Sequence, residues 1–293
     1  MNAPLAESGI QSYAAPGTVE DAARALAGGG ATVIAGGTDL MTDPAAPWSE
    51  RPGLVNINRV DSMRGITAGH GSIEIGALTT VTDVLNSDIL RASAPVLPET
   101  ADRFASDQIR NMATLGGNIV NASPAGDMII PLLLLDAGIE LVSWDGTALA
   151  SRTVPLDGIF EGPGRTSIRE DELLTAIRFA EPEAGFEARF EKSGPRPALE
   201  VALVSAGLAG IKRGDTLSSV RVAFGSVAPT PLRAPGTEAA LEGKKLDEAA
   251  IAAACDAAEE ETAPISDVRG SDWYRSRLVR AYMEGLLRHE AES

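Results

Sequence analysis

The centre of the chain reads Ala113-Thr114-Leu115-Gly116-Gly117-Asn118 and continues a little later as Ser123-Pro124-Ala125-Gly126-Asp127. Nearer the N-terminus, a short apolar strand runs into a similar stretch, Val33-Ile34-Ala35-Gly36-Gly37-Thr38-Asp39-Leu40. We call residues 33–40 the first glycine segment and residues 113–118 the second glycine segment. Glycines let the backbone come close to a ligand, and successive exposed N–H groups form a concavity that binds anions. The two segments therefore predict a diphosphate held from both sides, and the alternative is a pair of ordinary tight turns.

Neither segment matches a common nucleotide-binding fingerprint. The sequence has no G-x-G-x-x-G that opens a helix and no G-x-x-x-x-G-K-[ST]. Neither segment contains Lys or Arg, although Arg110 lies just upstream of the second. A bound phosphate would therefore depend on backbone amides and on three hydroxyl groups, those of Thr38, Thr114 and Ser123. We expect Asp39 and Asp127 to avoid phosphate and to accept hydrogen bonds from ribose or adenine, or to cap a helix.

Composition excludes several classes of protein. The chain has 293 residues, a formal net charge of −16, and 44% hydrophobic residues, so it is long enough for one large domain or two ordinary ones. Strong negative charge without a basic patch argues against nucleic-acid binding. The longest apolar run, 128–135, contains Pro131 and is far shorter than the roughly 20 residues of a membrane span.

Cysteine and histidine are scarce. Cys255 is the only cysteine, and His70 and His289 are the only histidines. This excludes an internal disulfide, a cysteine-bound iron–sulfur cluster and a Cys/His zinc site in this chain, and it leaves no Ser-His-Asp or Cys-His constellation. Residues 1–11 lack the features of a secretion signal. We therefore expect a cytoplasmic protein whose chemistry comes from a bound organic cofactor.

Hydrophobic periodicity and turn residues divide the chain into two parts. Helices and strands alternate up to about residue 180, a junction follows at 180–185, and beyond it strands precede helices, which is typical of an α+β domain. Thr18 is expected to cap the first helix. The expected helices are 19–27, 82–90, 98–104, 127–135, 246–261 and 272–289. The expected strands are 32–35, 54–57, 66–68, 72–76, 139–143, 187–191, 201–211 and 220–226.

The residues of both glycine segments resemble a known family. The chain is similar to the FAD-binding, or medium, subunit of molybdenum hydroxylases, the group of xanthine dehydrogenase and aerobic carbon monoxide dehydrogenase. The resemblance rests on 35–40 and on the long run 108–127. Further matches follow in family order at 171–177, 190–192, 263–270 and Tyr274-Arg275.

This resemblance implies a fold and a cofactor site. Residues 1–180 would form a two-lobed α+β FAD-binding domain of the PCMH/vanillyl-alcohol-oxidase type, with a lobe boundary near 55–65, and 185–293 a smaller α+β domain. No catalytic residue and no metal ligand is expected in this chain. The expected FAD-binding residues are Val33, Ile34, Ala35, Gly36, Gly37, Thr38, Asp39, Leu40, Phe104, Arg110, Thr114, Leu115, Gly116, Gly117, Asn118, Ser123, Asp127, Leu174 and Lys192.

The resemblance also implies partners. Electrons would pass from [2Fe–2S] clusters of a small subunit through FAD to NAD⁺ or oxygen, while a large subunit would hold molybdopterin, in a dimer of heterotrimers. One alternative is a self-contained FAD-dependent oxidoreductase of the same fold, although the scarcity of His and Cys speaks against a covalent flavin tether. Another is a non-catalytic scaffold that has lost its cofactor. The substrate is not defined by this chain, because the family binds it in another subunit.

Overall fold

A parallel three-stranded sheet begins the computed structural model, which describes residues 10–42, 53–194 and 201–292. Its order is β1-β3-β2, with strands β1 (Ser12–Ala14), β2 (Ala31–Ile34) and β3 (Gly53–Asn56). Helix α1 (Val19–Leu26) connects β1 to β2, and the Thr18 hydroxyl caps it by accepting from the Asp21 amide, as predicted. Strand β2 ends within the first glycine segment, so the sheet delivers that segment at its edge.

A five-stranded antiparallel sheet follows, in the order β4-β5-β10-β6-β7. Its strands are β4 (Ile66–Gly69), β5 (Ser72–Gly76), β6 (Gly138–Trp144), β7 (Leu149–Pro155) and β10 (Leu173–Ala180). The β4–β5 hairpin is confirmed, and it turns at His70, which is exposed and has a φ of 54°. Smaller elements are η2 (Asp61–Met63), η3 (Leu156–Gly158), β8 (Phe160–Gly162) and β9 (Arg165–Thr166).

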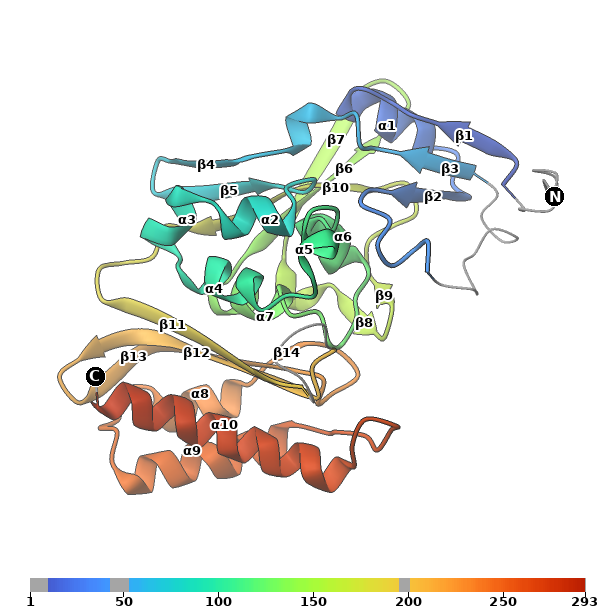
Figure 1. Cartoon of the computed structure of the whole chain (residues 1–293). Helices are drawn as coiled ribbons and strands as arrows, with labels where there is room; N and C mark the ends of the chain where they lie inside the picture. The colour runs from blue at the N-terminus through green and yellow to red at the C-terminus, as the bar shows by residue number, and fades with distance from the viewer. Residues whose placement is uncertain (1–9, 43–52, 195–200, 293) are drawn as a thin grey trace.

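Short helices fill the chain between β5 and β6, and Figure 1 shows them between this sheet and the C-terminal sheet. They are α2 (Val81–Leu85), α3 (Asp88–Ser93), α4 (Val96–Asp102), α5 (Asp107–Arg110), α6 (Leu115–Val120) and α7 (Ile129–Leu134). The single helix expected at 82–90 is wrong, because the Ser87 hydroxyl accepts from the Leu90 amide and starts a new helix. The helix expected at 98–104 begins and ends two residues earlier. Ala105, three residues after the end of the helix, has a φ of 40°.

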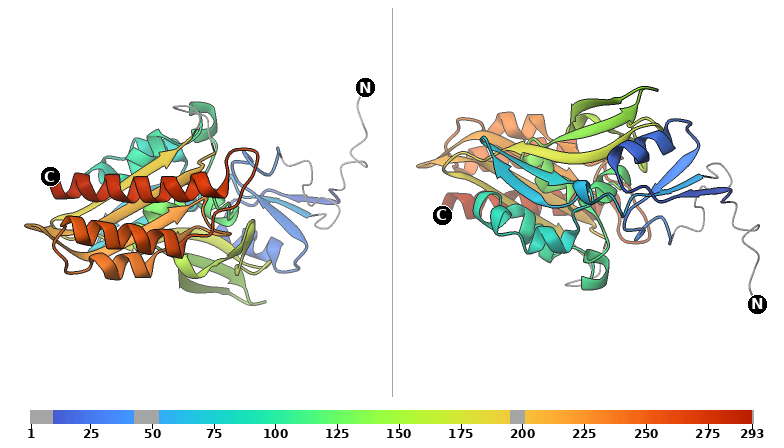
Figure 2. Two further views of the ribbon diagram at one scale, coloured as in Figure 1. Left: turned by 90° about the horizontal axis from the view of Figure 1, so that it is seen from below. Right: turned by 90° about the horizontal axis from the view of Figure 1, so that it is seen from above.

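The C-terminal part is a four-stranded antiparallel sheet with helices on one face. Its order is β11-β12-β13-β14, with strands β11 (Phe186–Ser193), β12 (Val204–Arg213), β13 (Thr216–Gly225) and β14 (Leu232–Arg233). The β12–β13 hairpin is tighter than expected and turns at Gly214, which has a φ of 61°. Figure 2 shows the long helices crossing this sheet. The helices are α8 (Pro235–Leu241), α9 (Glu248–Glu261) and α10 (Asp272–Glu292).

Buried apolar side chains form two clusters, one on each face of the C-terminal sheet. The first contains the core of the N-terminal part and extends to Phe190, Ala209 and Ala223 on that sheet. The second lies under α8–α10 and includes Cys255, whose pKa is raised to about 11 by burial. The α+β fold class is therefore confirmed. No helix among residues 10–42, 53–194 and 201–292 is long and apolar enough to cross a membrane.

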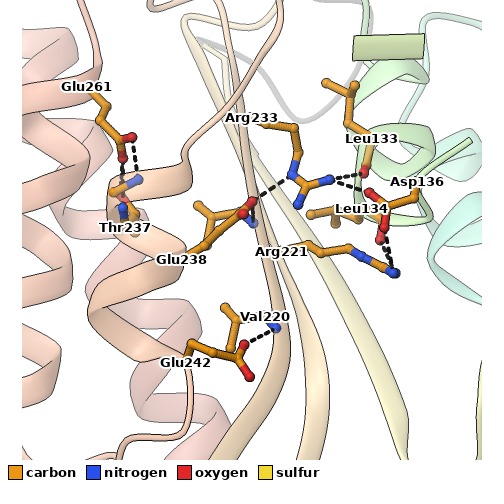
Figure 3. Close-up of polar contacts among 12 residues, drawn as sticks. Leu133, Leu134, Asp136, Val220, Arg221, Arg233, Thr237, Glu238, Glu242 and Glu261 are labelled. Atoms are coloured by element: carbon orange, nitrogen blue, oxygen red, sulfur yellow. Dashed lines mark hydrogen bonds and ion pairs between the residues drawn. The ribbon is translucent and has the colours of Figure 1, made fainter. Parts of the chain in front are cut away.

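Polar contacts join the end of α7 to the C-terminal sheet (Figure 3). Asp136, which has a φ of 48°, forms ion pairs with Arg221 and Arg233. Arg221 also donates to the carbonyl of Leu134 at 3.1 Å, and Arg233 to that of Leu133 at 3.2 Å. Cations are favourable at a helix C-terminus, where carbonyls lack partners. These contacts hold the two parts of the chain against each other.

Candidate functional site

The structure brings the two glycine segments into direct contact. A Cβ atom added to Gly36 would lie 1.8 Å from the carbonyl oxygen of Met112 and 3.2 Å from the nitrogen of Ala113. No side chain fits in that space, so glycine is required at position 36. Gly37 has a φ of +67°, a conformation that glycine adopts without strain. The first glycine segment therefore turns directly against the start of the second.

The backbone donors of the first glycine segment are available as far as the described residues go. Several of its carbonyls are used: Ala35 accepts from the Asn58 side chain at 2.7 Å, Gly37 from the Met41 amide and Asp39 from the Thr42 amide. Within the described part of the chain, none of the N–H groups of residues 35–39 has an acceptor. Turns that leave consecutive amides unpaired bind anions. The geometry thus agrees with the role predicted for this segment.

The second glycine segment has the opposite character, because it is not a loop. Thr114 caps helix α6 by accepting from the Gly117 amide at 3.1 Å. The Leu115 amide donates to the carbonyl of Thr79 and the Gly116 amide to that of Ala77, both at 2.9 Å. The Asn118 amide donates to the carbonyl of Thr114. The expectation that the amides of 115–118 would face an anion is therefore wrong, since each already has a partner.

One side-chain acceptor of the second glycine segment stays available. Oδ1 of Asn118 is buried and, among the residues described, has no hydrogen-bond partner. A buried unsatisfied acceptor costs roughly 1–3 kcal/mol unless a donor reaches it. Downstream, the Ser123 hydroxyl accepts from the Ala125 amide at 3.2 Å. The second glycine segment can therefore contribute side-chain groups to a ligand rather than an amide cradle.

A buried ion pair lies across the boundary between the two parts of the chain. Nζ of Lys192, at the end of β11, is 2.7 Å from Oδ2 of Asp127, and both side chains are about nine-tenths buried. Asp127 does not cap α7, so that alternative is wrong. Burial raises the pKa of Asp127 in spite of the charges of Lys192 and Arg103. Its Oδ1 is buried without a partner among the described residues, so it can accept a hydrogen bond from a ligand.

Arg103 is a site residue that sequence reasoning missed. Its guanidinium donates to the carbonyls of Phe190 (3.1 Å) and Lys192 (3.2 Å) and pairs with Glu191. Arg103 therefore fixes the backbone of β11 at Lys192, the residue whose side chain reaches Asp127. The only signal in the sequence is its position beside Phe104, because the residues it contacts lie almost ninety positions away.

Three other predicted residues, Phe104, Leu174 and Arg110, have different surroundings. Phe104 is half-buried against the core, and Leu174 on β10 is buried. The Arg110 guanidinium donates to the carbonyls of Asp102 and Phe104 and pairs with Asp107. Arg110 thus stabilises its own loop, and among the described residues it makes no hydrogen bond or ion pair with the first glycine segment.

The available groups suit a dinucleotide cofactor. The amides of 35–39, which have no acceptor among the described residues, match a diphosphate. Two acceptors that are buried without a partner in the same part of the chain, Oδ1 of Asn118 and Oδ1 of Asp127, match hydroxyl or ring N–H donors. The described residues contain no group of three or more His, Cys, Asp or Glu side chains placed to hold a metal ion. The site fits FAD on the chemistry of its own donors and acceptors.

Known proteins share this architecture over nearly the whole chain. A family model described as FAD binding domain in molybdopterin dehydrogenase matches residues 8–182, and one described as CO dehydrogenase flavoprotein C-terminal domain matches 189–289. The carbon monoxide dehydrogenase medium chain of Hydrogenophaga pseudoflava is 33% identical over 277 residues, covering 94% of this chain and 95% of the relative. The xanthine dehydrogenase FAD-binding subunit of Escherichia coli O157:H7 is 32% identical over 279 residues, covering 94% of each chain.

Solved structures agree with this. A chain of carbon monoxide dehydrogenase from Hydrogenophaga pseudoflava superposes with a TM-score of 0.88 at 33% identity, covering 94% of this chain and 95% of that chain. A chain of quinoline 2-oxidoreductase from Pseudomonas putida 86 superposes with a TM-score of 0.86 at 26% identity, covering 96% of each. Fold and site together define a flavoprotein subunit of an oxidoreductase, with an FAD-binding domain and a smaller C-terminal domain. The chain belongs to the family of FAD-binding medium subunits of molybdenum hydroxylases.

Proposed function

We propose that this chain is the electron-transfer subunit of a multi-subunit molybdenum hydroxylase. FAD bound here would supply the redox chemistry by which electrons from [2Fe–2S] clusters of a small partner subunit reach NAD⁺ or oxygen. One observation carries the proposal: among the described residues, the amides of 35–39 have no acceptor, and Gly36 of the same segment packs against Met112 at the start of the second segment, in a chain that also holds a buried Lys192–Asp127 pair. The chain has no Cys or His set for substrate chemistry, which agrees with a substrate site in a large molybdopterin subunit.

Each part of the site has its own task in this proposal. The amides of 35–39, with the Thr38 hydroxyl, bind the diphosphate. Asn118 and Asp127 accept hydrogen bonds through their unpaired Oδ1 atoms. Lys192 places a positive charge at the cofactor and keeps the buried carboxylate of Asp127 neutralised. The hydroxyls of Thr114 and Ser123 and the side chains of Phe104 and Leu174 complete the pocket walls.

We further propose a boundary between the two domains at residues 180–185, a dimer of heterotrimers as the assembly, and a cytoplasmic location. The boundary is supported by the two family models, which end and begin at residues 182 and 189. The single buried cysteine is compatible with a reducing compartment.

The first test is an absorption spectrum of the purified chain, before and after heat release of the cofactor. FAD, and not FMN, in the supernatant would support the proposal. A colourless chain that takes up no added FAD, alone or co-expressed with its partner chains, would overturn it. A self-contained oxidoreductase would instead be reduced by a small-molecule substrate without partners, so the flavin of the isolated chain is also challenged with candidate heterocycles and aldehydes. Bleaching by those compounds in the absence of partners would contradict the subunit role.

A further inference from the structure

Arg275 is a buried arginine in the first turn of α10 whose contacts lie outside its own helix. Only 3% of the residue is exposed. Its Nη1 donates to the carbonyl of Leu203 at 2.6 Å and to that of Ser226 at 3.0 Å, and its Nη2 pairs with Asp267 at 2.8 Å. A guanidinium presents its donors as a rigid planar fork. It therefore fixes the separation between the two backbone segments that it bridges.

The first of these segments, at Leu203, is hydrogen-bonded to the end of β11 that carries Lys192. Leu203 lies just before β12, and its amide donates to the carbonyl of Ser193 at 2.8 Å. Ser193 is the residue after Lys192, and Lys192 itself pairs with Ser205 across the β11–β12 ladder. A shift of Leu203 would therefore move the end of β11 that carries the Lys192 side chain.

The second segment, at Ser226, is hydrogen-bonded to the turn that precedes Asp127. Ser226 follows β13, and its amide donates to the carbonyl of Pro124 at 2.8 Å, in the turn that precedes Asp127. Ser226 has a φ of 64°, which is unfavourable for a residue with a side chain. A residue keeps such a conformation only when the surrounding structure holds it in place. Here Pro124 binds the amide of Ser226 and Arg275 binds its carbonyl.

We propose that Arg275 is a positioning residue of the flavin site: it holds the segments of Leu203 and Ser226 at the spacing in which Lys192 reaches Asp127. Its meaning for the cofactor rests on the proposed function, whereas its effect on the ion pair does not. Arg275 is about eighty positions from Lys192 in the sequence, and the ion pair that it supports joins the two parts of the chain.

The test measures how accessible Lys192 is. The full-length chain, freed of FAD, is pulsed with acetic anhydride, and acetylation of each lysine is followed by peptide mass spectrometry. The chain has only four lysines, Lys192, Lys212, Lys244 and Lys245, and the exposed Lys245 serves as the internal standard. Arg275→Met should raise labelling of Lys192 relative to Lys245 about tenfold, because local opening becomes easier.

Arg280→Met is the matched control. Arg280 lies on the same helix and pairs with Asp256 and Glu259 on α9, so its loss weakens packing of α10 without touching the bridged segments. It should leave Lys192 labelling at the wild-type level. Unchanged labelling in a folded Arg275→Met chain, or an equal rise in Arg280→Met, would overturn the proposal. Arg275→Lys keeps the charge beside Asp267 but cannot bridge both carbonyls, so it tests the same point if the Met variant does not fold.

FAD retention is the second readout. After gel filtration, Arg275→Met should bind FAD about tenfold more weakly than wild type, while Arg280→Met should match wild type. A wild-type chain without FAD would overturn the proposed function, yet Lys192 labelling would still decide the role of Arg275. Wild-type FAD affinity in a folded Arg275→Met chain would contradict the positioning role at the cofactor.

Discussion

The two glycine segments contain the same types of residue and use them in opposite ways. In the first, residues 35–39 leave their amides without acceptors among the described residues, Gly36 packs against Met112, and Gly37 turns with a positive φ. In the second, Gly116 and Gly117 form the first turn of α6, and their amides bind Ala77 and Thr114. In both segments a glycine lies close to another backbone, Gly36 to Met112 and Gly116 to Ala77. The comparison teaches that Gly-Gly indicates such a close approach, but not whether the neighbouring amides are left available for a ligand.

Gly36→Ala should have the largest effect, because it forces the two segments apart. The new Cβ would overlap the Met112 carbonyl, so we expect a loss of about 3 kcal/mol or more in the free energy of unfolding, together with loss of FAD. Urea denaturation and the flavin absorbance measure the two effects. Gly28→Ala is the control, since nothing lies within 4 Å of that position. Wild-type stability in Gly36→Ala would show that the segments do not touch.

Gly37→Asp should weaken FAD binding more than it destabilises the chain. A carboxylate beside the unpaired amides of the first glycine segment competes with a diphosphate for them and repels it, so FAD affinity should fall at least about 100-fold. The positive φ of Gly37 adds a strain of roughly 1–2 kcal/mol to the apo chain. Isothermal titration of the apo chain with FAD measures the first effect and urea denaturation the second. Full flavin occupancy would refute the diphosphate role of this segment.

Gly116→Ala should destabilise the chain and leave its FAD affinity nearly unchanged. Its Cβ would lie 2.7 Å from Cβ and 2.8 Å from the carbonyl oxygen of Ala77, which costs about 1–3 kcal/mol of stability through overpacking. FAD affinity of the folded fraction should stay within a few-fold of wild type, because the Gly116 amide already has a protein acceptor. The same titration and denaturation experiments apply. A loss of FAD affinity as large as that of Gly37→Asp would erase the distinction between the two segments.

The smallest expected effect concerns Glu172, a buried carboxylate whose role is structural. Its burial opposes ionisation, but hydrogen bonds from Arg152 and the Arg169 amide outweigh it and lower the pKa of Glu172. A lowered pKa contributes stability above the ordinary pKa of Glu, and this is lost as pH falls through the lowered value. Glu172→Gln should therefore cost about 1 kcal/mol at pH 7 and much less at pH 3.

Urea denaturation at pH 7, 5 and 3 checks this prediction. FAD affinity at pH 7 should stay at the wild-type level, which distinguishes Glu172 from Asp127 as the carboxylate of the site. A stability difference that grows toward low pH would contradict the direction of the shift.

Local features of the fold were predictable from the sequence. Thr18, the β4–β5 hairpin around His70 and the alanine-rich helix that buries Cys255 all follow from neighbouring residues. The helix at 115–120 was missed, because paired glycines disfavour helix. Carbonyls of Ala77 and Thr79, almost forty residues away, hold its first turn. Ser87 was missed as a cap inside an apolar helical pattern, although its hydroxyl is a local signal.

By itself, the sequence determined the family, the two parts of the chain, the absence of a cysteine or histidine site, and the residues that glycine chemistry singles out. Tertiary structure decided which of those residues have free groups. A backbone amide binds a ligand only if no other part of the protein accepts from it, and that depends on segments far away in the chain. The same holds for Lys192 and Asp127: burial raises the cost of each charge, and only folding places the other one 2.7 Å away.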